Sequence, residues 1–167
     1  MKKIAIVRSY FYQEISDRLV SGALSELNKL DPDNKIFSDY SDFYVSGIYE
    51  IPVIISKYIN NYDAFIAVGC VIKGKTPHFD FITKSTFDGL INLSIEYKKP
   101  IGNGIITALN MKQANERSSY KGKNKGKEAA RAIMSVISNP FKREMFDKIF
   151  PRKKWPYNTA QKIIQEL

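Results

Sequence analysis

Apolar residues alternate along the chain between short continuous runs and stretches with helical spacing. Extended segments are predicted at residues 2–9, 35–47, 62–72 and 100–107. The first and third contain the short apolar runs that are typical of strands buried on both faces of a parallel sheet. Helices are predicted at residues 14–30, 50–60, 79–97, 110–118 and 128–137, where apolar residues can gather on one face.

Strands that alternate with helices predict an α/β fold, a three-layer α/β/α sandwich with a four-stranded parallel, flavodoxin-like sheet. Ligands of such sheets bind beyond the carboxyl ends of the strands. We therefore expect the stretches at those ends to converge in space: residues 8–11, 45–50, 69–78 and 102–107.

The chain divides into a domain at residues 1–138 and a C-terminal extension at residues 139–167. Pro140, Pro151 and Pro156 limit the extension to short helices, while its large apolar side chains argue against a disordered tail. We expect it to pack on its own domain or on a neighbouring subunit.

Composition excludes several classes of protein. No apolar run approaches the length of a membrane span, and the N-terminal "MKKIAIVRSYF" is better interpreted as a strand than as a signal peptide. One cysteine allows no internal disulfide and is typical of a protein in the reducing cytoplasm. One histidine and one cysteine are too few for a structural zinc site.

The net charge of +9 is concentrated in residues 112–127 and 152–154. Such a chain can bind nucleic acid or anionic small substrates, or use its charge for solubility. No zinc-finger spacing or RNA-binding aromatic motif accompanies the basic groups, so nucleic-acid binding is the weaker alternative.

Candidate chemistry lies at the predicted strand ends. His78 can transfer protons near neutral pH, and it follows a Gly–Lys–Thr–Pro loop where free amides at the start of a helix favour an anion. Arg117 offers a planar fork of donors to a phosphate, and Glu50 can accept hydroxyl hydrogen bonds or simply favour a helix start. Phe11 can stack on a flat heterocycle. Cys70, inside an apolar strand, is interpreted as a small apolar residue and not as a nucleophile.

Four stretches resemble, in the same order along the chain, the motifs of the lumazine synthase family. Its members catalyse the penultimate step of riboflavin biosynthesis. They are "SGIYEIP" at 46–52, "GCVIKGKTPHFDFI" at 69–82, "NGIITALNMKQANER" at 103–117 and "NKGKEAA" at 124–130. The resemblance implies condensation of 5-amino-6-(D-ribitylamino)uracil with 3,4-dihydroxy-2-butanone 4-phosphate. It implies no cofactor and no metal.

The resemblance also assigns roles to particular residues. The heterocycle and ribityl chain would meet Phe11, Ile48, Tyr49, Glu50, Cys70, Val71 and Ile72. The phosphate would be held by Lys75, Thr76 and Arg117, with Asn103 and Lys125 completing the pocket and His78 moving protons. Asn103, Arg117 and Lys125 would come from the neighbouring subunit of a five-membered ring.

Some positions depart from the family pattern. Lys75 stands where alanine is usual, Ser46 where proline is usual and Tyr12 where asparagine is usual. The chain also lacks the N-terminal residues that add a strand to the neighbouring sheet in many members. With the C-terminal extension, this favours a pentamer or stacked decamer over a 60-subunit shell. A non-catalytic flavin-binding relative stays an alternative, although retention of His78 argues against it.

Overall fold

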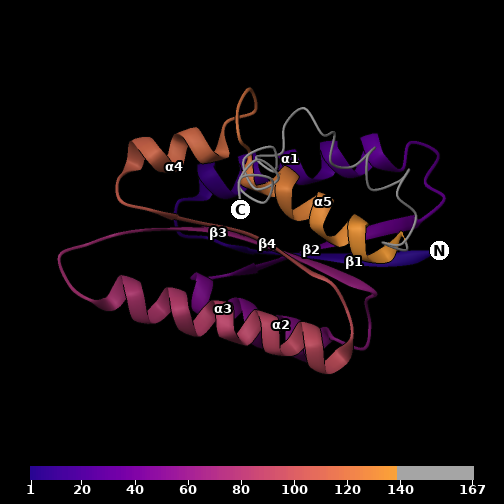
Figure 1. Ribbon diagram of the computed structural model, residues 1–167, viewed down its shortest axis with the longest axis horizontal. Helices are drawn as coiled ribbons and strands as arrows, with labels where there is room; N and C mark the ends of the chain where they lie inside the picture. The colour runs from indigo at the N-terminus through magenta and orange to yellow at the C-terminus, as the bar shows by residue number, and fades with distance from the viewer. Residues whose placement is uncertain (139–167) are drawn as a thin grey trace, which may run out of the picture.

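A central sheet of four parallel strands organises the chain (Figure 1). The computed structural model describes residues 1–138, so the predicted packing of the extension at 139–167 lies outside the described residues. The strands are β1 (Lys2–Ser9), β2 (Phe37–Val45), β3 (Ala64–Ile72) and β4 (Ile101–Ala108), in the spatial order β2-β1-β3-β4. The predicted parallel sheet is confirmed.

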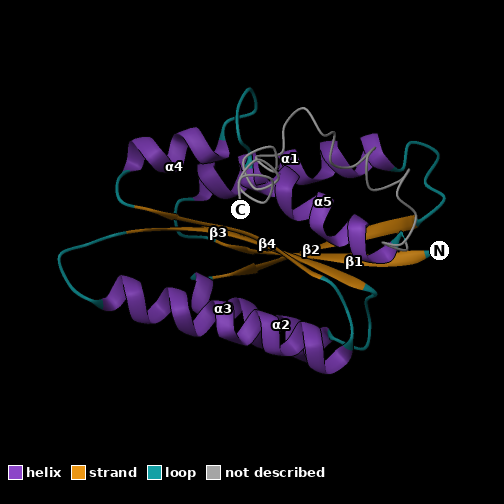
Figure 2. Cartoon of the chain, viewed as in Figure 1, coloured by secondary structure: helices purple, strands orange, loops and turns teal. Residues whose placement is uncertain are grey.

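Helices cover both faces of this sheet and make the three predicted layers (Figure 2). They are α1 (Gln13–Leu30), the short 3-10 turn η1 (Ile48–Glu50), α2 (Ile51–Tyr58), α3 (His78–Tyr97), α4 (Met111–Ser118) and α5 (Lys125–Ile137). Helices α1, α4 and α5 lie on one face, and α2 and α3 lie on the other. No helix within residues 1–138 combines the length and apolar character needed to cross a membrane.

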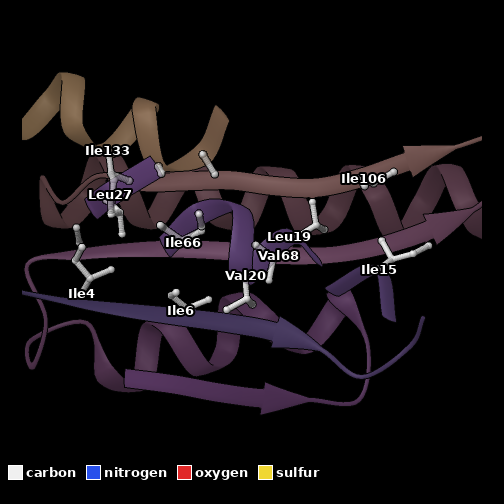
Figure 3. Close-up of a cluster of buried hydrophobic side chains, with 14 of the residues drawn as sticks. Ile4, Ile6, Ile15, Leu19, Val20, Leu27, Ile66, Val68, Ile106 and Ile133 are labelled. Carbon is white, nitrogen blue, oxygen red and sulfur yellow. The ribbon is translucent and has the colours of Figure 1, made fainter. Parts of the chain in front are cut away.

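The core consists of two apolar layers, one on each side of the sheet. Ile4 and Ile6 of β1 point to the face covered by α1 and α5, where Leu19 and Ile133 meet them (Figure 3). Val7, the next residue of β1, points to the opposite face and packs in the layer under α2 and α3. Because both faces of β1 and β3 are buried, their apolar runs show no alternation with polar residues.

The turn between α1 and β2 is closed by a buried carboxylate. Asp31 accepts hydrogen bonds from the backbone N–H groups of Lys35, Ile36 and Phe37, at 2.9, 2.8 and 3.0 Å. Burial by itself would raise the pKa of Asp31, but these donors and the Lys35 ammonium outweigh it and the pKa is lowered. The Asp31 carboxylate therefore holds the turn between α1 and β2.

Helix α5 begins at Lys125 and not at the predicted residue 128, because Asn124 caps it. The Asn124 side-chain oxygen accepts from the Lys127 N–H, while its amide nitrogen donates to the carbonyls of Arg18 and Ser118. The helices approach so closely here that a Cβ on Gly126 would lie 1.9 Å from the Leu19 carbonyl oxygen. Asn124 thus joins α1, α4 and α5. Residues 112–127 stand out in the sequence only for their positive charge, which did not predict this structural role.

Replacing Asn124 with alanine is expected to lower the free energy of unfolding by about 2–4 kcal/mol, because three backbone groups lose their partner. Urea unfolding followed by circular dichroism measures the change. Asn28→Ala, at an exposed position of α1, is the matched control and should change stability by about 0.5 kcal/mol or less. Equal effects of the two substitutions would contradict the role given to Asn124.

Candidate active site

A cavity of about 330 Å³ opens at the carboxyl ends of β1, β2 and β3. Its lining comes from the loops that follow β1 and β2, the end of β3 and the start of α3: Phe11, Tyr12, Ser46, Gly47, Ile48, Tyr49, Glu50, Cys70, Val71, Ile72, His78 and Ile82. Three of the predicted strand ends therefore converge as expected. The cavity holds every residue that the resemblance assigns to the heterocycle and ribityl chain, together with His78.

The loop that carries Phe11 is an extension of the pairing between β1 and β2. The Tyr10 N–H donates to the Val45 carbonyl at 2.7 Å, and the Phe11 N–H donates to the Ser46 carbonyl at 3.2 Å. Tyr12 then turns the chain into α1 with a left-handed backbone, φ 57°. The Phe11 ring is left 66% exposed at the cavity wall, where a flat ring could stack on it.

Arg8 anchors this corner of the sheet from the α1 side. Its guanidinium donates to Asp17 of α1 at 2.7 Å and pairs with Asp42 of β2 at 2.9 Å, and it lies 4.0 Å from the centre of the Tyr44 ring. Burial raises the pKa of Asp42, Arg8 lowers it, and Asp17 raises it, with a net rise. The ion cluster ties the first turns of α1 to β2 and so supports the Phe11 loop.

Glu50 closes the turn that follows β2. Its Oε2 atom accepts the Gly47 N–H at 2.9 Å and the Ser46 hydroxyl at 3.1 Å. The carboxylate therefore caps η1, as a residue at the third position of such a turn often does. Its other oxygen accepts no hydrogen bond within residues 1–138, so it stays available to a ligand hydroxyl.

Cys70, Val71 and Ile72 form the floor of the cavity at the end of β3. Cys70 is buried, and burial raises the pKa of its thiol to about 11. A thiol with so high a pKa is a poor nucleophile. The interpretation of Cys70 as a small apolar residue is supported, and any ligand contact here falls to the backbone and to the half-buried Val71 and Ile72.

His78 is the first residue of α3, and it lines the cavity together with Ile82 of the same helix. Pro77 is the N-cap, and no side chain caps this helix. First-turn amides at such an end favour an anion. Lys75 and Thr76 lie just before it in an exposed loop outside the cavity lining, and Lys75 forms no ion pair with any residue of the described part.

Arg117 and Lys125 line a different cavity of about 700 Å³, between α4 and α5. Lys121 and Lys123 join them there, and the Lys125 ammonium pairs with Glu128 at 2.9 Å. The Arg117 side chain is exposed and makes no ion pair within the described range. Within one chain these cations do not meet His78 at the first cavity.

The predicted strand at residues 100–107 is confirmed, but residues 102–107 do not join the other three strand ends at the main cavity. Strand β4 ends at Ala108, and Asn103 pairs with Ala67 in the strand interior. Asn103 is exposed on this edge strand, and its side-chain oxygen accepts the Ile105 N–H at 3.0 Å. Gly74, in the loop before α3, lies in open space, where an added Cβ would meet no atom within 4 Å.

Tyr12, Ser46, Gly47 and Ile82 line the cavity although they were not among the predicted site residues. Tyr12 and Ser46 could have been found, because both were departures from the family pattern beside predicted contacts. The only signal at Ile82 was its helical spacing, which indicates a core residue and gives no sign of a cavity. Among residues 1–138, no cluster of three His, Cys, Asp or Glu side chains could hold a metal ion.

Comparison with known proteins matches this architecture to one family. The family model described as 6,7-dimethyl-8-ribityllumazine synthase matches residues 1–140. Proteins of that name are similar to this chain in Buchnera aphidicola (41% identical over 138 residues, 81% of this chain and 85% of theirs) and Bartonella tribocorum (38% over 138 residues, 81% and 87%). The protein of that name from Campylobacter curvus is 36% identical over 139 residues, 82% of this chain and 87% of its own.

Because the Cys70 pKa is raised to about 11, only about 0.1% of the thiol should be ionised at pH 8. We expect iodoacetamide to label the native protein at least about a hundredfold more slowly than the same chain unfolded in urea, which is the internal control. Mass spectrometry of timed samples gives both rates. Comparable rates would show that the thiol is accessible and ionised in the native protein.

Proposed function

The chain belongs to the 6,7-dimethyl-8-ribityllumazine synthase family of riboflavin biosynthesis, and from that premise we propose the reaction it catalyses. The enzyme condenses 5-amino-6-(D-ribitylamino)uracil with 3,4-dihydroxy-2-butanone 4-phosphate and releases 6,7-dimethyl-8-ribityllumazine, phosphate and water. The observation that carries this proposal is the cavity in which Phe11, Glu50 and His78 meet at the strand ends.

The uracil substrate occupies the cavity between the Phe11 loop and the end of β3. Phe11 stacks on the heterocycle, whose large flat face suits an exposed aromatic ring. The free oxygen of Glu50 accepts ribityl hydroxyls, while Ile48 and Tyr49 flank the chain. Backbone groups of residues 70–72 hold the pyrimidine edge.

The phosphate of the second substrate binds at the start of α3. Thr76 supplies a hydroxyl and the first-turn amides supply N–H donors. Lys75, which forms no ion pair within residues 1–138, adds an ammonium. Arg117 supplies the bidentate fork, and it does so from a neighbouring subunit, because within its own chain it lines another cavity.

His78 transfers the protons of the reaction. Formation of the imine between the uracil amine and the ketone needs a proton at the departing water, and elimination of phosphate needs a proton removed from carbon. An imidazole in the cavity lining, next to the phosphate loop, can serve both steps. The amine is itself the nucleophile, so much of the rate enhancement comes from holding the two substrates together.

The working unit is a ring of five subunits or a multiple of it, in the cytoplasm. Two features support the ring. The proposed site residues divide between two cavities of one chain, and the α2–α3 face exposes Val53, Phe81, Ile91 and Ile95. Asn103 on the exposed edge strand and Lys125 then complete the neighbour's site. The single free thiol, Cys70, accords with a reducing compartment.

When the two substrates are mixed with the protein, we expect the lumazine product to form and one phosphate to be released per turnover. The absorbance of the lumazine measures its formation. His78→Ala is expected to reduce kcat by about a hundredfold or less, and not to abolish it, since positioning is retained. Lys84→Ala, on the exposed side of α3, is the control. Product at no more than the uncatalysed rate with wild-type protein would exclude the proposed function.

A shared site predicts complementation between two defective variants. Glu50→Gln and Arg117→Gln subunits are unfolded, mixed in equal amounts and reassembled. Random assembly should place intact Glu50 and Arg117 together in about one quarter of the sites, because each comes from a different chain. Each variant reassembled alone is the control. A mixture no more active than its components would mean that the site lies within one chain.

A further inference from the structure

Ser46 contacts two of the proposed substrate-binding residues at once. It follows the last residue of β2 and lines the main cavity. Its carbonyl accepts the Phe11 N–H at 3.2 Å, and its hydroxyl donates to Glu50 Oε2 at 3.1 Å. One residue therefore connects the aromatic wall of the cavity to its carboxylate.

The hydroxyl contact determines which carboxylate oxygen meets a ligand. Glu50 Oε2 already receives the Gly47 N–H at 2.9 Å, and the Ser46 hydroxyl occupies a second lone pair of the same atom. Hydrogen bonds to an ionised group are stronger than those between neutral groups. With two donors on Oε2, rotation of the carboxylate is restricted and Oε1 is left as the acceptor for the ligand.

Resting on the proposed function, we propose that Ser46 is a positioning residue that fixes Glu50 for recognition of the ribityl chain. A proline at this position, which the family pattern would place there, has no hydroxyl and no N–H to offer Glu50. The carbonyl link to Phe11 does not depend on the side chain, so the hydroxyl link to Glu50 is the contact that a proline would remove.

Loss of the hydroxyl should weaken binding of one substrate and leave the chemical step alone. The Ser46–Glu50 contact exists before substrate binds and serves the polyol, whereas the reacting amine, ketone and phosphate lie toward His78. The effect of Ser46→Ala should therefore appear in KM for the ribitylaminouracil. The value of kcat and the KM for the ketone phosphate should stay within about twofold of wild type.

Steady-state kinetics with each substrate varied in turn tests this. Ser46→Ala is expected to raise KM for the ribitylaminouracil by about three- to tenfold, the value of one hydrogen bond to a charged group partly exposed to water. Ser46→Thr retains a hydroxyl and should restore most of the loss. Ser56→Ala, at an exposed position of α2 without a side-chain hydrogen bond in the described residues, is the matched control.

A double-mutant cycle separates action through Glu50 from a general structural effect. In a Glu50→Gln background, Ser46→Ala should raise KM by less than about twofold, because the charged acceptor is already gone. An undiminished effect in that background would overturn the proposal, as would a Ser46→Ala enzyme with unchanged KM. Absence of product from wild-type protein would instead exclude the proposed function. In that case, calorimetric titration with the ribitylaminouracil tests the role of Ser46 without turnover. Equal Kd values for wild type and Ser46→Ala would overturn the proposal that Ser46 positions Glu50.

Discussion

Strands β1 and β3 pair in parallel and are buried on both faces, and the remaining architecture follows from that burial. The central residues of both strands are closed to water on both faces, so helices must cover the sheet on both sides. The chain leaves β1 through α1 toward β2 and returns through α2 to β3 on the other side of β1. The connection that leaves β1 runs toward β2 and the one that leaves β3 runs toward β4, so a crevice opens between the carboxyl ends of β1 and β3. The main cavity lies at this point.

The walls of that cavity are short loops held mainly by backbone hydrogen bonds. The Phe11 loop continues the ladder of β1 and β2, and the Glu50 turn is closed by its own carboxylate. Arg8 adds an ion cluster on the α1 side of the sheet. Each wall of the site is anchored to a buried strand, which holds the shape of the cavity. Three groups at the cavity are left for a ligand: the Phe11 ring, the Oε1 atom of Glu50 and the His78 imidazole.

Positive charge is distributed separately from this cavity. The cations that form no ion pair within residues 1–138 include Lys75 at the start of α3, and Arg117, Lys121 and Lys123 on the α4–α5 side. Lys125, by contrast, is neutralised in part by Glu128. A cation before a helix start and a separate cluster of cations are each suited to an anionic group. The main cavity is instead lined by aromatic, aliphatic and hydroxyl groups, with one carboxylate, one imidazole and one thiol.

The sequence by itself determined the order of the elements, the parallel sheet and most of the residues of the main cavity. Apolar runs of sheet length and helical spacing are local signals, and the motifs "SGIYEIP" and "GCVIKGKTPHFDFI" place their residues at strand ends whatever the remaining contacts are. Only the tertiary structure showed that Asn103 lies away from the main cavity, that Arg117 and Lys125 line another cavity, and that Asn124 caps α5 and joins it to α1. It also showed the contact of Ser46 with Glu50. These depend on register, on the close approach of α1 and α5, and on side-chain direction, which are set by packing between segments far apart in the chain and leave no local pattern in it.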